Sequence, residues 1–228
     1  MSTHPNNALL QAYASGDIDA VSGLAIATHL EVCPNCRDLV AGFETQHADV
    51  FVAETQSADE ISASSFELSL FDAMFDDIIQ SESKADVHDV YEPRYIEVKG
   101  KRFMLPQTLC RYADLMSEWR SYGGKVFSSQ LDFGEEARVN LMYICEGVQI
   151  PQHTHKGIET TLVLHGCFSD EDGEYRVGDF LQRDASVKHS PRTEQNQDCL
   201  CLTVLTEPMI FTQGVARIFN LFGKGLYP

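Results

Sequence analysis

The stretch GVQIPQHTHKGIETTLVLHG, residues 147–166, contains the pattern that decides the fold of the second half of the chain. It reads G-x5-H-x-H-x3-E-x6-G, with His153, His155 and Glu159 as its polar members. On a strand, His153 and His155 face the same side because successive side chains alternate between the two faces. After a tight turn, Glu159 can return beside them. Two imidazoles and a carboxylate suit a divalent transition metal inside a small barrel.

Short runs of β-prone residues surround this stretch, and turns rich in Gly, Asp and Pro separate them. The runs lie within residues 98–105, 125–127, 138–144, 160–164 and 200–205. Many short strands without long helices between them indicate a β-sandwich or a β-barrel. Residues 109–124 are expected to interrupt the strands as a short helix or loop.

The pattern around the two histidines resembles the first motif of the cupins, a family of jelly-roll barrels. The second cupin motif reads G-x5-P-x-G-x2-H-x3-N, and Gly178 and His189 keep its spacing here. Asp184, Ser186 and Thr193 stand where cupins often have Pro, Gly and Asn, and these departures concern the turn rather than the ligand. The resemblance implies a metal set of His153, His155, Glu159 and His189. The alternative is a cupin barrel that binds no metal.

A second candidate metal site lies in HLEVCPNC, residues 29–36. His29 and Cys33 are four residues apart, so they share one face of a helix. Cys36 follows near the start of the next helix, where unpaired backbone N–H groups favour a thiolate. Three soft or borderline ligands that converge at a helix junction suit zinc.

A closed structural zinc site needs a fourth ligand. His4, which precedes the first expected helix, is the first candidate, and His47 is the second. The competing interpretation makes Cys33 and Cys36 a redox CxxC pair. Such a pair is expected beside a thioredoxin-like βαβ pattern, which this region lacks, and it leaves His29 unexplained. The spacing therefore favours zinc over redox chemistry.

The first 80 residues have the pattern of helices. Asn6 can cap a first helix that ends at Gly16, and a second helix is expected to start near residues 17–19. Pro34 suits the first turn of a third helix. A capping box that starts at Ser64 opens a fourth helix.

The fourth expected helix is very apolar for its place in the chain. Its candidate contact residues are Phe66, Leu70, Phe71, Met74, Phe75 and Ile78. One interpretation makes this helix part of the core of a four-helix bundle. The other makes it a helix that docks into a groove of a partner protein. Periodicity alone favours the core.

Charge is distributed unevenly along the 228 residues, whose net charge is −17. Residues 1–90 hold 16 acidic and 2 basic residues, whereas residues 91–228 hold 18 and 15. Phosphate backbones repel an acidic first half, which argues against direct nucleic-acid binding. The acidic half could instead meet a basic protein surface. The alternative is that the charge only keeps a small domain soluble.

Composition and motifs together predict an α + β multidomain chain. A zinc-stabilised helical bundle is expected at 1–82, a linker at 83–95 and a cupin barrel at 96–228. No apolar run is long enough to span a membrane, and the first residues lack the pattern of a signal peptide, so a cytoplasmic location is expected. In that reducing compartment, the seven cysteines are expected to be ligands, redox thiols or core residues rather than disulfides.

The whole layout resembles the ChrR group of zinc-binding anti-sigma factors. The resemblance rests on an early histidine before ALLQAYASG, then ATHLEVCPNC, HTHKGIETTLVL and DCLCL. It implies that the helical domain binds an extracytoplasmic-function-type sigma factor, one to one, and blocks its access to RNA polymerase. It also implies that the cupin senses oxidative stress, such as singlet oxygen, and releases the sigma factor. In that setting the fourth helix would wedge between sigma domains.

Other functions remain open on the residues alone. Many cupins with such ligands are metal-dependent oxygenases or isomerases, with the helical domain as a regulatory addition. A metal or redox buffer without a partner is a third class. Cys199 and Cys201 face one side of a strand and could be redox sensors near the metal or small buried packing residues. Zinc is expected in both sites under the anti-sigma interpretation.

Overall fold

The computed structural model describes residues 3–57, 65–80, 92–213, 216–217 and 220. Contacts divide the chain into two compact units, one of residues 1–43 and 93–228 and the other of residues 44–92. The expected domain limits of 1–82, 83–95 and 96–228 follow the sequence motifs rather than these contacts, and they stay a prediction.

Three helices open the chain: α1 (Asn7–Ser15), α2 (Ala20–Val32) and α3 (Pro34–Ser57). The Asn6 side chain caps α1 by accepting a 2.9 Å hydrogen bond from the backbone N–H of Leu9. Gly16 ends α1 in the left-handed conformation that glycine adopts without strain. Asp19 caps α2 in the same way, with a 2.8 Å bond from the N–H of Ser22. The predicted starts of these helices are confirmed, because short polar side chains satisfy their first N–H groups.

The fourth helix, α4 (Ser65–Gln80), lies in the unit of residues 44–92. Ser64 and the side chains of Phe66 and Leu70 lie outside the described residues. The other four candidate contact residues are 54–68 % exposed: Phe71, Met74, Phe75 and Ile78. The apolar face of α4 is therefore accessible to a partner. Among the described helices, none is long and apolar enough to cross a membrane.

The second half of the chain consists of short strands, as predicted. The strands are β1 (Tyr95–Val98), β2 (Lys101–Met104), β3 (Arg120–Tyr122), β4 (Val126–Leu131), β5 (Arg138–Ile144), β6 (His153–His155), β7 (Glu159–Ser169), β8 (Glu174–Arg176), β9 (Phe180–Arg183), β10 (Cys199–Leu205) and β11 (Met209–Phe211). A short helix α5 (Gln107–Cys110) and the 3-10 turn η1 (Ala113–Leu115) interrupt them. The interruption falls inside residues 109–124 only in part, because α5 begins two residues earlier.

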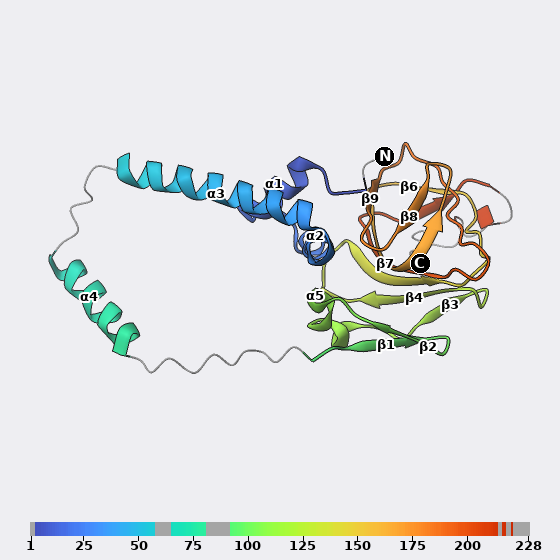
Figure 1. Ribbon diagram of the computed structural model, residues 1–228, viewed down its shortest axis with the longest axis horizontal. Coiled ribbons are helices and arrows are strands. Elements are labelled where there is room, and N and C mark those ends of the chain that lie inside the picture. The colour runs from blue at the N-terminus through green and yellow to red at the C-terminus, as the bar shows by residue number, and fades with distance from the viewer. Residues whose placement is uncertain (1–2, 58–64, 81–91, 214–215, 218–219, 221–228) are drawn as a thin grey trace. The chain divides into compact units, whose positions relative to one another are not determined.

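The strands form an antiparallel barrel of the expected jelly-roll type (Figure 1). The main sheet has the order β3-β4-β5-β10-β7-β8, and β9 pairs with β7. All seven residues of β10 are buried, since this strand lies between β5 and β7. A second sheet pairs β6 with β11, and His153 of β6 forms a β-bridge with His189. This topology brings both cupin motifs to the same end of the barrel interior.

Gly166, the last fixed glycine of the first motif, allows β7 and β10 to approach closely. Its φ of +69° lies in the left-handed region, and a Cβ placed there would be 1.8 Å from the backbone oxygen of Asp198. The register between the two strands shifts nearby, between Leu200 and Cys201. The motif therefore needs glycine for both conformation and space.

The first two helices share one hydrophobic core with the barrel. Leu10 of α1 and Ile26 of α2 belong to the same buried cluster as Tyr143 and Leu202 of the barrel strands. The carboxylate of Glu31 accepts hydrogen bonds from the first N–H groups of α5, 2.9 Å from Gln107 N and 2.6 Å from Thr108 N. Figure 1 shows α2 beside α5. The junction of α2 and α3 is thus fixed against the cupin barrel.

Candidate metal centres

The structure brings His4, His29, Cys33 and Cys36 together at the junction of α2 and α3. The Nδ1 atom of His4 lies 3.4 Å from Cys33 Sγ and 3.6 Å from Cys36 Sγ. The Nε2 atom of His29 lies 3.4 Å from Cys36 Sγ. His47, the alternative fourth ligand, is exposed on α3 and is not a member of this cluster.

These spacings fit a tetrahedral zinc ion. Bonds of about 2.3 Å to sulfur and about 2.0 Å to nitrogen separate such ligand atoms by roughly 3.6 Å. His29 donates its Nδ1–H to the carbonyl oxygen of Gly178 at 2.8 Å, which leaves Nε2 free to coordinate. Burial lowers the pKa of His29, which favours the neutral ring that a metal requires.

The pKa of the Cys36 thiol differs from the expectation that the helix end favours a thiolate. Burial, followed by the hydrogen bond with Cys33, raises the pKa of Cys36 to about 11. The desolvation of this buried sulfur outweighs the partial positive charge of the N-terminus of α3. A divalent cation beside both sulfurs would supply the positive charge that holds them as thiolates.

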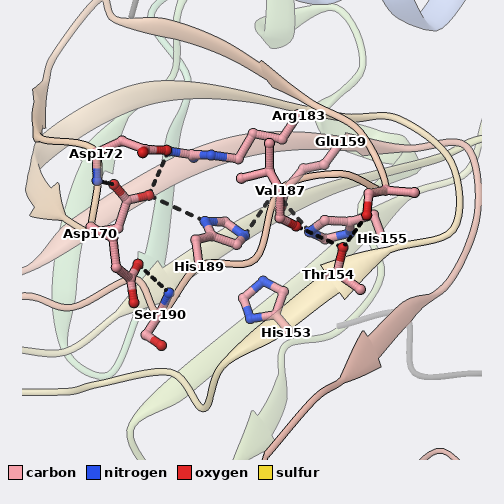
Figure 2. Close-up of polar contacts among 12 residues, drawn as sticks. His153, Thr154, His155, Glu159, Asp170, Asp172, Arg183, Val187, His189 and Ser190 are labelled. Carbon is pink, nitrogen blue, oxygen red and sulfur yellow. Dashed lines mark hydrogen bonds and ion pairs between the residues drawn. The ribbon is translucent and has the colours of Figure 1, made fainter.

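The second cluster brings together His153, His155, Glu159 and His189 in the barrel interior. His155 Nε2 lies 3.0 Å and His189 Nε2 lies 3.5 Å from the same oxygen of Glu159, Oε2. His153 donates its Nδ1–H to the carbonyl oxygen of Pro151 at 2.9 Å, so its Nε2 is also free. All four side chains are buried, and Figure 2 shows His189 and His155 directed toward Glu159.

Buried polar atoms at this cluster lack hydrogen bonds, which is the pattern that a cation would satisfy. Within the described residues, His155 Nε2, Glu159 Oε2 and His189 Nε2 have no hydrogen-bond partner. Although His155 Nε2 lies 3.0 Å from Glu159 Oε2, the two atoms form no hydrogen bond. Buried orphan atoms of this kind are rare. Three imidazoles and one carboxylate fit a divalent transition metal.

Electrostatics at the second cluster keep His153 and Glu159 in the forms that coordinate a metal. Burial, with help from His189, lowers the pKa of His153 to about 4, so the ring is neutral at pH 7. Burial raises the pKa of Glu159, but its histidine neighbours, His155 first, outweigh that effect and lower it to about 2. The charged carboxylate of Glu159 and the neutral ring of His153 are the forms that bind a metal.

Two buried residues that sequence reasoning missed support His189. Asp170 Oδ2 lies 3.3 Å from His189 Nδ1 and accepts a 2.5 Å hydrogen bond from Arg183 Nη2 (Figure 2). Asp170 thereby orients the ring so that Nε2 faces the cluster. The second cupin motif does not indicate either residue. Asp170 precedes the motif, and the motif accepts any residue at position 183.

The three departures from the second cupin motif are accommodated locally. Asp184 accepts a 2.9 Å hydrogen bond from the backbone N–H of Ser186, which closes the turn without Pro or Gly. Thr193 donates its hydroxyl to the carbonyl oxygen of Cys145 and accepts a bond from Val148 N. Thr193 thus ties the turn at Gly147 to the end of the motif.

Cys199 and Cys201 lie side by side on β10, with their Sγ atoms 3.4 Å apart. Both are buried. The hydrogen bond with Cys201, followed by burial, raises the pKa of Cys199 well above its ordinary value. Cys201 lines the same small cavity as His153 and Glu159 of the second cluster.

Comparisons with known proteins match both halves of the chain. A family model described as ChrR Cupin-like domain matches residues 114–208, and a model described as Putative zinc-finger matches residues 8–37. The second range contains His29, Cys33 and Cys36, and His4 lies ahead of it.

Two relatives match nearly the full length. Anti-sigma-E factor ChrR of Cereibacter sphaeroides is 31 % identical over 222 residues, which cover 96 % of each chain. The crystal structure of Rhodobacter sphaeroides SigE in complex with the anti-sigma ChrR matches with 30 % identity and a TM-score of 0.62. That match covers 89 % of this chain and 97 % of the other. The chain therefore belongs to the ChrR family of anti-sigma factors rather than to a family of enzymes.

Proposed function

We propose that the protein binds and inhibits an extracytoplasmic-function-type RNA polymerase sigma factor and releases it under oxidative stress, such as singlet oxygen. The observation that carries this proposal is the match, over 97 % of that chain, to a protein whose structure is a complex with SigE. The expected complex contains one copy of each protein and forms in the cytoplasm. It involves neither a membrane nor direct contact with nucleic acid.

The exposed face of α4 supports the binding part of the proposal. Phe71 and Phe75 are 67 % and 63 % exposed, and Asp72, Asp76 and Asp77 alternate with the apolar residues of the helix. An apolar helix face with acidic neighbours suits a groove on a basic partner, because apolar contacts give affinity and charges speed the encounter. The exposed residues Met74 and Ile78 extend the same face, and Phe66 and Leu70 are proposed to belong to it.

Zinc is the ion that we propose for both clusters. In the first cluster, His4, His29, Cys33 and Cys36 would hold a structural zinc, whose binding contributes free energy to folding. In the second cluster, His153, His155, Glu159 and His189 would hold a second zinc that supplies positive charge beside Glu159. The support is the ligand spacing of the first cluster and the orphan buried atoms of the second.

The cupin is the proposed sensor, with Cys199 and Cys201 as its candidate redox residues. Their support is the 3.4 Å separation of the two sulfurs and the position of Cys201 in the cavity of the second cluster. The raised pKa of Cys199 disfavours its thiolate, so a reaction at Cys199 would start from the protonated sulfur. Substitution of both residues by Ser tests this role. A stress response that survives the double substitution would make them packing residues only.

Co-expression with a candidate sigma factor tests the proposal as a whole. Full-length chain and sigma factor are expected to co-purify as a complex of one copy each, with two zinc ions per anti-sigma chain by elemental analysis. A chain that purifies alone beside every extracytoplasmic-function sigma factor of the same genome would contradict the binding proposal. Iron or manganese in the second cluster would contradict only the identity of that metal.

A further inference from the structure

The segment from Gly178 to Arg183, which contains β9, contacts both clusters. At its first residue, the carbonyl oxygen of Gly178 accepts the Nδ1–H of His29 at 2.8 Å. Two residues later, the N–H of Phe180 donates a 2.9 Å hydrogen bond to the carbonyl oxygen of Thr3, next to His4. The Phe180 ring also packs edge to face against the His29 ring, with centroids 5.7 Å apart. One end of the segment therefore orients a ligand of the first cluster.

The other end of the segment supports the second cluster. Arg183 is 3 % exposed, and its Nη2 atom lies 2.5 Å from Asp170 Oδ2. The same oxygen lies 3.3 Å from Nδ1 of His189. Across the strand pair, Arg183 is also the partner of Glu159 in the register of β9 with β7. A displacement of Arg183 would therefore reach two members of the second cluster.

The chemistry of metal sites makes such supporting contacts important. A histidine ligand keeps its tautomer and ring orientation through the hydrogen bond of its other nitrogen, and loss of that bond weakens metal binding about 10- to 100-fold. Here Gly178 gives that support to His29, and Asp170 gives it to His189. A strand of four residues held on both sides by buried contacts moves as one piece, since packed cores resist gradual deformation.

We propose that the segment Gly178–Arg183 links the two metal clusters, with Asp170 and Arg183 as positioning residues, so that loosening either cluster weakens the other. The inference rests on the proposed metal binding and gives the cupin a route to the sigma-binding half. Both clusters lie in the same compact unit, which contains residues 1–43 and 93–228. Such a coupling is reciprocal, because each site must change the free energy of binding at the other equally.

Cobalt(II) in the full-length chain provides a probe that reports on the first cluster alone. Thiolate ligands give cobalt a charge-transfer absorption band, and only the first cluster has cysteine ligands, Cys33 and Cys36. The rate at which the band disappears in excess EDTA then measures how firmly this cluster holds its ion. The second cluster is followed in parallel by elemental analysis of the cobalt that stays bound.

Asp170→Asn is the decisive variant, because it keeps the shape of the side chain and removes the charge that holds Arg183. We expect the thiolate band to disappear about 5- to 10-fold faster than in the unmodified chain, within the range of typical coupling between sites. Glu174→Gln is the matched control, since Glu174 is an exposed acid at the start of β8, four residues from Asp170. The control is expected to leave the rate unchanged.

Phe180→Leu tests the link in the opposite direction. This variant changes the packing on His29 and is expected to speed the loss of cobalt from the second cluster. Arg183→Lys, which keeps the buried charge but lacks the guanidinium that contacts Asp170, replaces Asp170→Asn with the same expected effect if the latter fails to fold.

An unchanged band in Asp170→Asn or its replacement, together with normal retention at the second cluster in Phe180→Leu, would overturn the link. An unmodified chain that gives no thiolate band would refute the proposed first metal site as well. Neither measurement involves a sigma factor, so its outcome is independent of sigma binding.

Discussion

The Nδ1 atom of His4 lies 3.4 Å from the Sγ atom of Cys33, although 29 positions separate the two residues in the chain. A residue ahead of α1 thereby completes a cluster that is otherwise built where α2 meets α3. Thr3, its neighbour, also accepts the hydrogen bond from β9. Thr3 and His4 are thus held by the barrel and by the first cluster together.

His4→Ala is expected to remove zinc from the first cluster, because three ligands leave the coordination shell open and weaken binding. Elemental analysis of the purified full-length chain should show the second zinc only. His47→Ala is the matched control, since His47 is an exposed histidine outside the cluster. Equal zinc contents in the His4 variant and the unmodified chain would show that His4 is no ligand.

Local spacings indicate six of the eight members of the two clusters, whereas His4 is named for its place ahead of the first expected helix and His189 from the resemblance to the second cupin motif. His29 and Cys33 are one helical turn apart, and His153 and His155 alternate on one strand. The supporting contacts could not be predicted in this way. His29 and Gly178 are 149 positions apart, and their hydrogen bond depends on how α2 packs against the barrel.

The same distinction between local and tertiary effects holds for the fold. Asn6 and Asp19 predict helix starts because capping is a local hydrogen bond. Leu10 packs in the same hydrophobic core as the barrel strands, and no local sequence pattern predicts this tertiary contact. The same is true of Cys36, where burial outweighs the local effect of the helix end on the thiol pKa.

Phe71→Ser together with Phe75→Ser is expected to weaken sigma binding about 10- to 100-fold, because apolar anchors dominate interface energies. Both side chains are exposed, so the free energy of unfolding should change little. Titration calorimetry measures the affinity, and Met104→Ser, on an exposed residue of β2, is the control. Unchanged affinity in the double variant would exclude this face of α4 from the interface.

Gly166→Ala is expected to lower the free energy of unfolding by about 3 kcal/mol or more, because the new Cβ would overlap the backbone oxygen of Asp198. Gly134→Ala separates the two causes, since Gly134 has a φ of +72° and a Cβ added there would meet no atom within 4 Å. Gly134→Ala should lower the free energy of unfolding by about 1–2 kcal/mol, because only the backbone conformation is unfavourable there. Urea denaturation measures both variants, and equal losses would refute the close approach of β7 and β10.

Asp198 should make stability depend on pH. Burial raises its pKa, but Lys101 and then Tyr143, at 2.5 and 2.7 Å, outweigh burial and lower the pKa below its ordinary 3.8. A lowered folded pKa stabilises the protein above the unfolded pKa, and the gain is lost as pH falls through the folded pKa. Asp198→Asn should therefore lower the free energy of unfolding by about 1 kcal/mol at pH 6, a modest loss because Lys101 is half exposed. Below pH 3.8 the loss should be smaller.

Urea denaturation of both proteins between pH 3 and pH 7 checks this expectation. The loss of metal at low pH affects the two chains alike, so the difference in their free energies of unfolding isolates Asp198. A difference that stays constant over the whole range would contradict the ion pair with Lys101.

Transcription by purified RNA polymerase with the partner sigma factor tests the central claim most directly. The zinc-loaded full-length chain, added in equal amount to the sigma factor, is expected to suppress sigma-dependent transcripts. Illumination with a photosensitiser that generates singlet oxygen is expected to restore them, and the same light without the dye is not. Transcripts that persist at an excess of the chain would contradict the inhibition, and suppression that survives the singlet oxygen would contradict the release.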